Sequence, residues 1–176
     1  MDATVIGGYA TAVGVIISVF TLASSVFTLA YQSRKARFNT SVQLVLEFDK
    51  RFNSPSFEVK RQQAATAILA KPTDVSWAEP IFDLFEMIGY LVKKEAIADE
   101  LALITFYYWV HGYWTIGKIH IQQKHGYEKD VWGNFEYLHN RLLEIQRKTA
   151  NRFEREIMSE ADKNIFLNEE KDLSPS

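Results

Sequence analysis

The chain has 176 residues and a formal net charge of −2. This length suits one folded domain with an appended segment, and the near-neutral charge creates no field that would draw the chain to DNA. Because the sequence contains no cysteine, disulfides, thiolate zinc sites and a cysteine nucleophile are excluded. Aromatic residues make up 14% of the chain, which indicates a well-packed interior or interface.

The first predicted element is a transmembrane helix within residues 1–33, preceded by a short outer tail. The run from Val5 to Tyr31 contains no charged residue. As a helix it would extend about 40 Å, which exceeds the roughly 30 Å hydrocarbon core of a bilayer. A cleaved signal peptide and a buried helix are the alternatives. We favour the span because no Lys or Arg precedes the run and because the run is too long for a signal peptide.

A basic junction follows this run and predicts its orientation. Arg34, Lys35 and Arg37 lie directly after the apolar residues, whereas the preceding tail carries only Asp2. The positive-inside rule then places the N-terminus outside a bacterial inner membrane and the rest of the chain in the cytoplasm. The lipid bilayer is thus an expected partner, and the three basic side chains could also contact anionic head groups.

Small and hydroxyl-bearing residues recur along the predicted span at spacings of 3 and 4. This periodicity places them on one face of a helix. The stripe consists of Thr11, Gly14, Ser18, Thr21, Ser25 and Thr28. Two interpretations stay open: the stripe packs against another helix, most simply a second copy of the chain, or it lines the wet lumen of a homo-oligomeric pore.

Residues 34–158 are predicted to form an all-α bundle, because no segment alternates with a period of 2 and no Asn-Gly or Asp-Gly hairpin turn occurs. The predicted helices cover about 38–52, 55–70, 76–94, 99–125 and 128–157. Residues 159–176 are polar and net acidic, which predicts a flexible tail.

Local signals support the predicted helix starts. Ser54 can cap a helix that has Pro55 at its first position. Ser76 and Glu79 have the spacing of a capping box, and Asp99 is a candidate cap for the next helix. That helix is also apolar, but His111 and other ionisable residues within it argue against a second membrane span.

No catalytic motif stands out, and we expect no catalytic residue, cofactor or metal. The sequence lacks a Gly-rich phosphate loop, a His-Glu-x-x-His pair and a nucleophile elbow. We interpret His111 as a hydrogen-bonded core residue, and the aromatic residues around it as core rather than as a base-stacking surface. Glu136, His139 and Arg141 form a candidate polar cluster, in which Glu136 and His139 would do acid–base chemistry or form a surface ion pair.

Three stretches together carry a family resemblance: FDKRFNSPSFEVKRQ (48–62), FDLFEMIGYLVKKEAIADELALITFYYWVHGYW (82–114) and VWGNFEYLHNRL (131–142). With the predicted span and the basic junction, they make the layout similar to that of the small membrane accessory proteins encoded beside the RNA-targeting effector of type VI-B CRISPR systems. The resemblance implies a divergent HEPN-like bundle, a homo-oligomeric pore ring that permeabilises the inner membrane in antiphage defence, and an RNA-guided effector or its products as a partner.

The sequence departs from that family's nuclease signature, which is an Arg followed four to six residues later by His. Lys118 and His125 have the spacing but the wrong base, and His139 and Arg141 stand in the wrong order. We therefore expect no RNA cleavage. The predicted function is a pore-forming accessory effector; a membrane tether or scaffold whose bundle recruits a partner protein is the first alternative, and a membrane-bound ribonuclease with an unrecognised site is the second.

Overall fold

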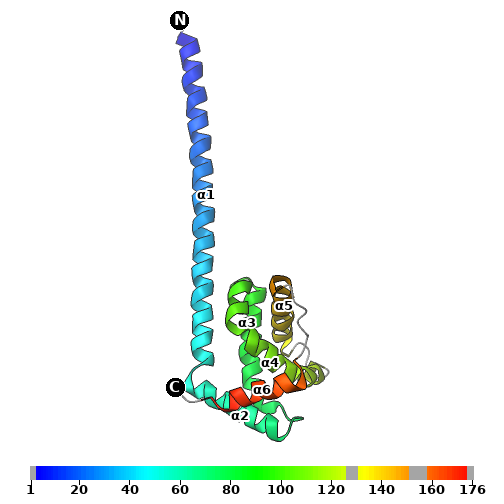
Figure 1. Ribbon diagram of the computed structural model, residues 1–176. Helices are drawn as coiled ribbons and strands as arrows, with labels where there is room; N and C mark the ends of the chain where they lie inside the picture. Colours follow the sequence, from blue (N-terminus) through cyan, green and yellow to red (C-terminus); the bar gives the residue numbers. More distant parts are fainter. Residues whose placement is uncertain (1–2, 126–130, 151–157, 174–176) are drawn as a thin grey trace. The chain divides into compact units, whose positions relative to one another are not determined.

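The computed structural model describes the backbone of residues 3–125, 131–150 and 158–173, and the side chains of residues 24–125, 131–149 and 158–173. All regular elements within these ranges are helical, so the predicted all-α class is confirmed (Figure 1). The chain divides into two units, residues 1–39 and 40–176. The elements are α1 (Ala3–Phe52), α2 (Pro55–Ala70), the 3-10 helix η1 (Ser76–Ala78), α3 (Glu79–Lys93), α4 (Asp99–His125), α5 (Gly133–Ala150) and α6 (Glu160–Lys171).

The predicted transmembrane helix is wrong. Among the described residues, no helix is both long enough and apolar enough to cross a bilayer. Within the described side chains of α1, the charge-free segment covers residues 24–31, which is about 12 Å of helix, and Arg34, Lys35 and Arg37 follow it. The expected placement in an inner membrane, with the N-terminus outside and the bundle in the cytoplasm, is therefore not supported either. Since the pore implied by the resemblance requires a span, it is not carried forward.

Of the helix starts predicted from local signals, that of α2 is confirmed and that of α3 is wrong. α2 begins at Pro55 after an extended Ser54, as predicted. The predicted capping box is wrong, because α3 starts three residues later than its expected cap. The hydroxyl of Ser76 donates to Asp74 Oδ1 at 2.7 Å, and Ser76 itself lies in η1. A nearer acceptor therefore takes the hydroxyl that a cap would have used.

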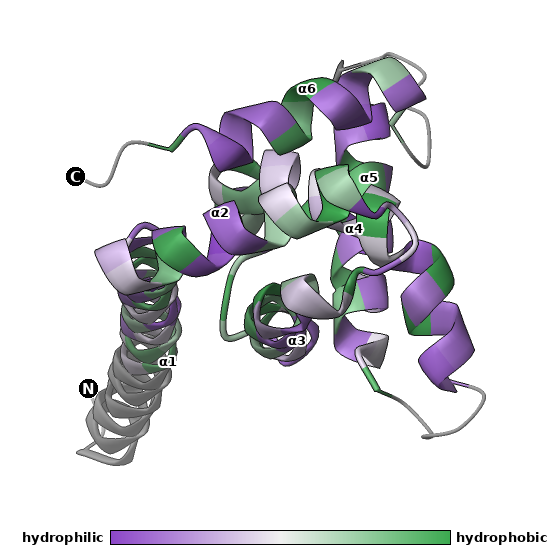
Figure 2. Ribbon diagram, turned by 90° about the horizontal axis from the view of Figure 1, so that it is seen from below, coloured by the Kyte–Doolittle hydropathy of each residue, from purple (hydrophilic) through white to green (hydrophobic). Residues whose placement is uncertain are grey.

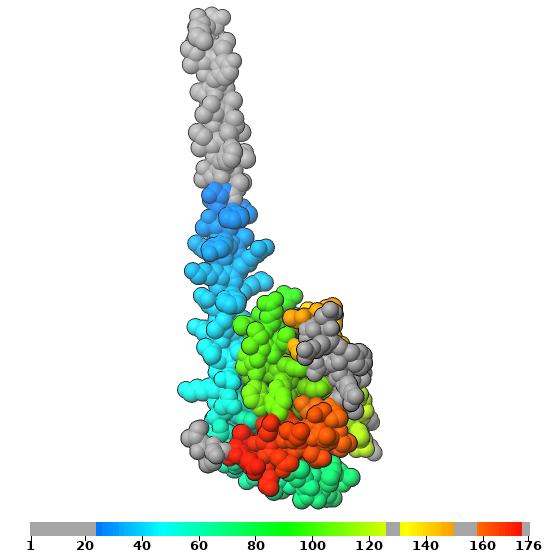
Figure 3. Space-filling model, viewed as in Figure 1, coloured from blue at the N-terminus to red at the C-terminus, as the bar shows by residue number. Residues whose placement is uncertain are grey.

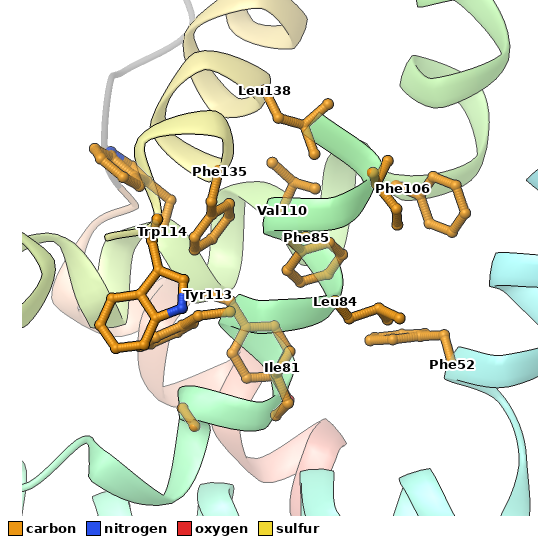
Figure 4. Packing of buried hydrophobic residues seen from close by; sticks show 14 of the residues in the cluster. Phe52, Ile81, Leu84, Phe85, Phe106, Val110, Tyr113, Trp114, Phe135 and Leu138 are labelled. Atoms are coloured by element: carbon orange, nitrogen blue, oxygen red, sulfur yellow. The ribbon is translucent and has the colours of Figure 1, made fainter. Parts of the chain in front are cut away.

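The core of the second unit is aromatic (Figure 4). Phe85 of α3 lies between Phe52 at the end of α1 and Phe135 of α5, with ring-centroid distances of 5.7 Å and 5.4 Å. Trp114 of α4 meets the same Phe135 edge-on at 5.6 Å. These four residues are at most 1% exposed. Rings from four helices thus fill one interior, as the high aromatic content predicted.

Close approach of α3 and α5 depends on a glycine. A Cβ atom at Gly89 would lie 2.0 Å from the backbone oxygen of Asn134, which is far inside van der Waals contact. Because the obstacle is backbone and not a flexible side chain, no larger residue fits unless the two helices separate. Gly89 therefore sets the distance between these helices.

The structure differs from the predicted flexible tail at residues 159–176. α6 packs against α2 (Figures 1 and 2), and its Phe166, Leu167 and Glu170 are buried. Ser159 caps this helix by accepting the backbone N–H of Asp162 at 3.2 Å. The acidic residues Glu160, Asp162 and Glu169 of α6 are exposed, so a charged composition concealed a helix with a narrow apolar face.

Candidate functional site

The first part of α1 carries several exposed apolar residues close together in the sequence. Every described residue from 24 to 40 is exposed. Figure 3 draws this segment in blue, with side chains projecting around the helix. The large apolar residues on it, with their exposed fractions, are Val26 (59%), Phe27 (75%), Leu29 (66%), Tyr31 (62%) and Phe38 (56%).

Three of these residues lie on one helix face. Phe27, Tyr31 and Phe38 follow each other by 4 and 7 residues, which returns the side chain to the same side of an α-helix. We call these three residues the exposed stripe. Runs of this spacing are typical of helices that pack against another helix.

The same spacing continues into the second unit, where the residues are covered. Val45, Phe48 and Phe52 extend the series by 7, 3 and 4 residues, and their exposed fractions are 5%, 7% and 0%. We call these three residues the buried stripe. Phe52 contacts Trp109 of α4 at 5.2 Å between ring centroids. α1 thus has one periodic face that is exposed in its first unit and buried in its second.

The structure describes the side chains of only two residues of the predicted hydroxyl stripe, Ser25 and Thr28. Thr11, Gly14, Ser18 and Thr21 lie outside the residues whose side chains are described. Ser25 and Thr28 are exposed, and the hydroxyl of Thr28 donates to the carbonyl of Ser24 at 2.9 Å. A hydroxyl that bonds back to the previous turn needs no second helix to satisfy it.

The basic junction lies on the same exposed segment. Arg34, Lys35 and Arg37 are all exposed, and they fall between Tyr31 and Phe38 of the exposed stripe. No acidic residue occurs in α1 before Glu47. Arg34 lies three residues after Tyr31 and four before Phe38, on the face of the exposed stripe itself, so the segment is both apolar and positively charged.

Two histidines of the bundle, His111 and His139, lie inside a stack of rings. His111 Nδ1 is 3.1 Å from His139 Nε2, and the two parallel rings have centroids 5.4 Å apart. Tyr107 stacks on His111, and Trp114 stacks on His139 at 5.0 Å. His111 is 5% exposed and His139 is fully buried. The interpretation of His111 as a hydrogen-bonded core residue is confirmed.

The candidate polar cluster of residues 136, 139 and 141 divides between the interior and the surface. His139 joins the buried ring stack, whereas Arg141 donates to Asp99 Oδ2 of α4 at 2.6 Å and 2.8 Å. Glu136 lies half-buried in the first turn of α5. The hydrogen bond to Asp99 raises the pKa of Arg141, so this side chain stays charged as part of an interhelical ion pair.

A buried ionic network links three helices. The guanidinium of Arg61 on α2 donates to both carboxylate oxygens of Glu170 on α6, at 2.6 Å and 2.7 Å. The hydroxyl of Tyr113 on α4 donates to Glu170 Oε2 at 2.6 Å. Arg61 also lies over the Phe52 ring, with 4.0 Å between its Cζ atom and the ring centroid. The network therefore holds α6 against α2 and covers the end of the buried stripe.

The pKa values of Arg61 and Tyr113 both move in the direction that keeps the network intact. Burial alone would lower the pKa of Arg61, but the hydrogen bonds and negative charge of Glu170 outweigh it and raise that pKa. Burial raises the pKa of Tyr113 well above its ordinary value of 10.0, and the neighbouring Glu170 raises it further. Tyr113 is therefore a neutral donor and Arg61 a permanent cation, as a paired buried charge requires.

The described residues contain no group of three His, Cys, Asp or Glu side chains that could hold a metal ion. Sequence reasoning missed the Arg61–Glu170 pair, because its members lie 109 residues apart and Glu170 falls in a segment rich in acidic residues. It also missed the exposed stripe, which the assignment of the same residues to a membrane span concealed. The spacing of aromatic residues through Tyr31, Phe38 and Phe52 was the signal that could have revealed it.

The fold and these contacts define an all-α protein with an aromatic, ion-paired core and an exposed helical segment. The chain belongs to the family described as Domain of unknown function (DUF4760), whose model matches residues 9–142. No curated protein and no solved structure matches the chain. Because the family description assigns no activity, the resemblance to the type VI-B accessory proteins stays a prediction.

Proposed function

We propose that this chain is a self-associating helical scaffold protein, whose copies join through the exposed stripe of α1. The observation that carries this proposal is the contrast along a single helix face: Tyr31 and Phe38 are 62% and 56% exposed, whereas Val45 and Phe52, at the same spacing of 7, are 5% and 0% exposed. This function develops the scaffold alternative of the sequence analysis without the membrane.

The exposed stripe provides the driving force. Burying a large apolar side chain is worth about 1.5–3 kcal/mol. Phe27, Tyr31 and Phe38 are each more than half exposed, and they stand on the same side of the helix. A helix whose aromatic residues all face water gains little from tertiary packing, which normally supplies most helical stability. Association through this face would supply that packing.

The partner that we propose for the exposed stripe is the exposed stripe of a second copy of the chain. Helix-spaced apolar residues pair best with a face of the same spacing, and each copy carries one. The charges select the direction. In a parallel pair, Arg34, Lys35 and Arg37 of both helices would face each other, whereas an antiparallel pair centred near Tyr31 places them beside the charge-free residues 24–31 of the other copy.

The positions of the acid–base groups favour a scaffold over the ribonuclease alternative. His139 is fully buried and bonds His111, and the guanidinium of Arg61 is held by Glu170. A general base must come within hydrogen-bond reach of its substrate, which a fully covered imidazole does not. These groups serve the packing of the bundle, whereas the residues of the exposed stripe of α1 face solvent.

The test measures the mass of the full chain in solution by light scattering over a range of concentrations. The wild-type chain is expected to form dimers or larger assemblies. A variant with Phe27→Glu, Tyr31→Glu and Phe38→Glu should be monomeric, because three charges on the stripe oppose burial. Ser33→Glu, on the other side of the same helix, should associate like the wild type. A wild-type chain that stays monomeric at every concentration would contradict the proposal.

A further inference from the structure

Three side chains attach α6 to the surface that α2 and α4 form. Phe166, Leu167 and Glu170 are 1%, 2% and 2% exposed, whereas the remaining residues of α6 are exposed or half-buried. A helix of 12 residues is marginally stable by itself in water, so α6 depends on the surface that it packs against. Anchors on one face of a short helix are typical of a helix that binds as a ligand.

The surface of α4 is shaped to receive an aromatic ring. A Cβ atom at Gly112 would lie 2.5 Å from Cε2 of Phe166, so the ring occupies space that any larger residue at position 112 would fill. Tyr113 packs edge-on against the same ring at 5.1 Å between centroids, and Tyr108 does so at 5.5 Å. The absence of a side chain at one position and the two tyrosines beside it therefore match a phenylalanine.

The carboxylate-binding group of this surface is oriented by residues outside α6. Arg61 Nη1 donates to the carbonyl oxygen of Phe52 and to Asn53 Oδ1, both at 3.3 Å. Its Nε and Nη2 donate to Glu170, to which Tyr113 also donates. A guanidinium held in this way presents a planar pair of donors that suits one carboxylate. We call Arg61, Gly112 and Tyr113 the α6-binding surface.

The α6-binding surface and α6 belong to different parts of the sequence. The family match covers residues 9–142, so it includes Arg61, Gly112 and Tyr113, and α6 lies beyond it. The contacts between the two parts are those of a surface with a separate short helix. An identical helix from another molecule can make the same contacts.

We infer that the α6-binding surface is a site for an amphipathic helix with the pattern Phe-Leu-x-x-Glu, and that α6 of a second copy of the chain can occupy it in exchange for the chain's own α6. The exchanged helix makes the same contacts, so exchange costs little. An attached helix has an effective concentration of about 1 mM, so the chain's own α6 prevails in dilute solution. Exchange is expected where copies are concentrated, and in this respect it rests on the proposed scaffold.

The first experiment measures helix binding by the full chain with a fluorescently labelled peptide of residues 159–173. The chain's own α6 competes with the peptide. Chains with Phe166→Ala or with Glu170→Gln should therefore bind it at least about tenfold more tightly than the wild type, by fluorescence anisotropy. The chain with Lys171→Gln, at an exposed position of α6, should bind it like the wild type.

A second peptide separates this site from unfolding of the chain. The peptide with Phe166→Ala should bind every chain at least about tenfold more weakly, because it lacks the ring that fits over Gly112. The two chain variants weaken α6 through different side chains, and a misfolded chain would not distinguish the two peptides. Equal affinity of the wild-type peptide for all chains, or no binding to any of them, would overturn the inference.

The second experiment tests exchange between copies in chains that carry the three glutamate substitutions of the exposed stripe. One chain adds Arg61→Lys, which keeps the charge but loses the planar pair of donors, and the other adds Glu170→Gln. The mixture combines an intact α6-binding surface with an intact α6, so it should form heterodimers in sedimentation velocity, while each chain alone stays monomeric. A mixture no more associated than its separate components would contradict exchange. Because the stripe is charged in both chains, this result does not depend on association through the stripe.

Discussion

α1 presents the same periodic face to two different surroundings. In residues 40–52 that face is buried, and its last member, Phe52, packs against Phe85 and Trp109. In residues 24–39 it carries Phe27, Tyr31 and Phe38, each more than half exposed. The spacing of the apolar residues is alike in the two regions, so the difference lies in what is available to cover them.

The two regions show that apolar spacing along a helix does not by itself determine whether the rest of the chain buries that face. An apolar stripe at helical spacing is stabilised when another surface packs against it. The fold of the chain supplies such a surface for the buried stripe but not for the exposed stripe. Under the proposed function, a second copy of the chain covers the exposed stripe. Exposed aromatic residues with such regular spacing are unlike the scattered surface residues that need no explanation.

The largest expected effect is on the free energy of unfolding, which should fall when a residue of the buried stripe is truncated but not when a residue of the exposed stripe is. Phe52→Ala should lower the free energy of unfolding by about 3–5 kcal/mol, because it leaves a cavity among packed rings. Phe38→Ala in the monomeric, dilute chain should change it by less than about 0.5 kcal/mol, as for other surface positions. Urea unfolding followed by circular dichroism measures both. Equal losses would remove the distinction between the stripes.

A loss of stability of similar size is expected when Arg61, which covers the end of the buried stripe, is replaced. Arg61→Met removes the cation that lies over Phe52 and leaves Glu170 buried without its partner. Breaking a buried pair in this way costs about 3–5 kcal/mol. The double variant Arg61→Met, Glu170→Met is the control, and it should recover much of the loss. A double variant as unstable as the single one would show that the pair also does something beyond charge compensation.

A smaller loss of stability is expected from a substitution at Gly89, where α3 and α5 approach each other closely. Gly89→Ala forces the backbones of α3 and α5 apart, and overpacking of this kind costs about 1–3 kcal/mol. Thermal unfolding monitored by circular dichroism gives the change. Gly133→Ala, which has open space at its Cβ position, is the matched control. If both variants unfold at the wild-type temperature, Gly89 does not set the helix spacing.

The smallest expected effect is a dependence on alkaline pH. The pKa of Tyr113 is raised in the folded chain above its ordinary value of 10.0, so folding favours the proton. Its stabilisation is complete below pH 10 and is lost as the pH rises above 10, by at most about 1.4 kcal/mol per pH unit. Urea midpoints measured from pH 8 to 11 should fall more steeply for the wild type than for Tyr113→Phe. Parallel curves would contradict this assignment.

The helices could be predicted from the sequence wherever a local signal decides them. Ser54 and Pro55 fix the start of α2 whatever surrounds it, because proline lacks the N–H that a first helical turn does not need. α6 could not be predicted in this way. Its burial depends on α2, which lies about 100 residues earlier in the sequence, and only Phe166, Leu167 and Glu170 face inward.

The candidate site was less predictable than the fold. The spacing of Tyr31, Phe38, Val45 and Phe52 is visible in the sequence, but which members are covered depends on the whole bundle. The charge-free run before Arg34 suggested a membrane span, because hydropathy alone does not distinguish lipid from another helix. The pairing of Arg61 with Glu170 has no local signature at all.

The self-association of α1 can be tested most directly by disulfide cross-linking, since the chain has no native cysteine. Single cysteines replace Ser24, Tyr31, Ser33 and Phe38, and purified chains are oxidised alone and in mixtures. An antiparallel pair centred at residue 31 predicts that Tyr31→Cys links to itself and that Phe38→Cys links to Ser24→Cys, while Ser33→Cys links poorly. If Phe38→Cys instead links mainly to itself, the helices are parallel. If no position exceeds Ser33→Cys, the exposed stripe does not join copies of the chain, and the scaffold account is contradicted.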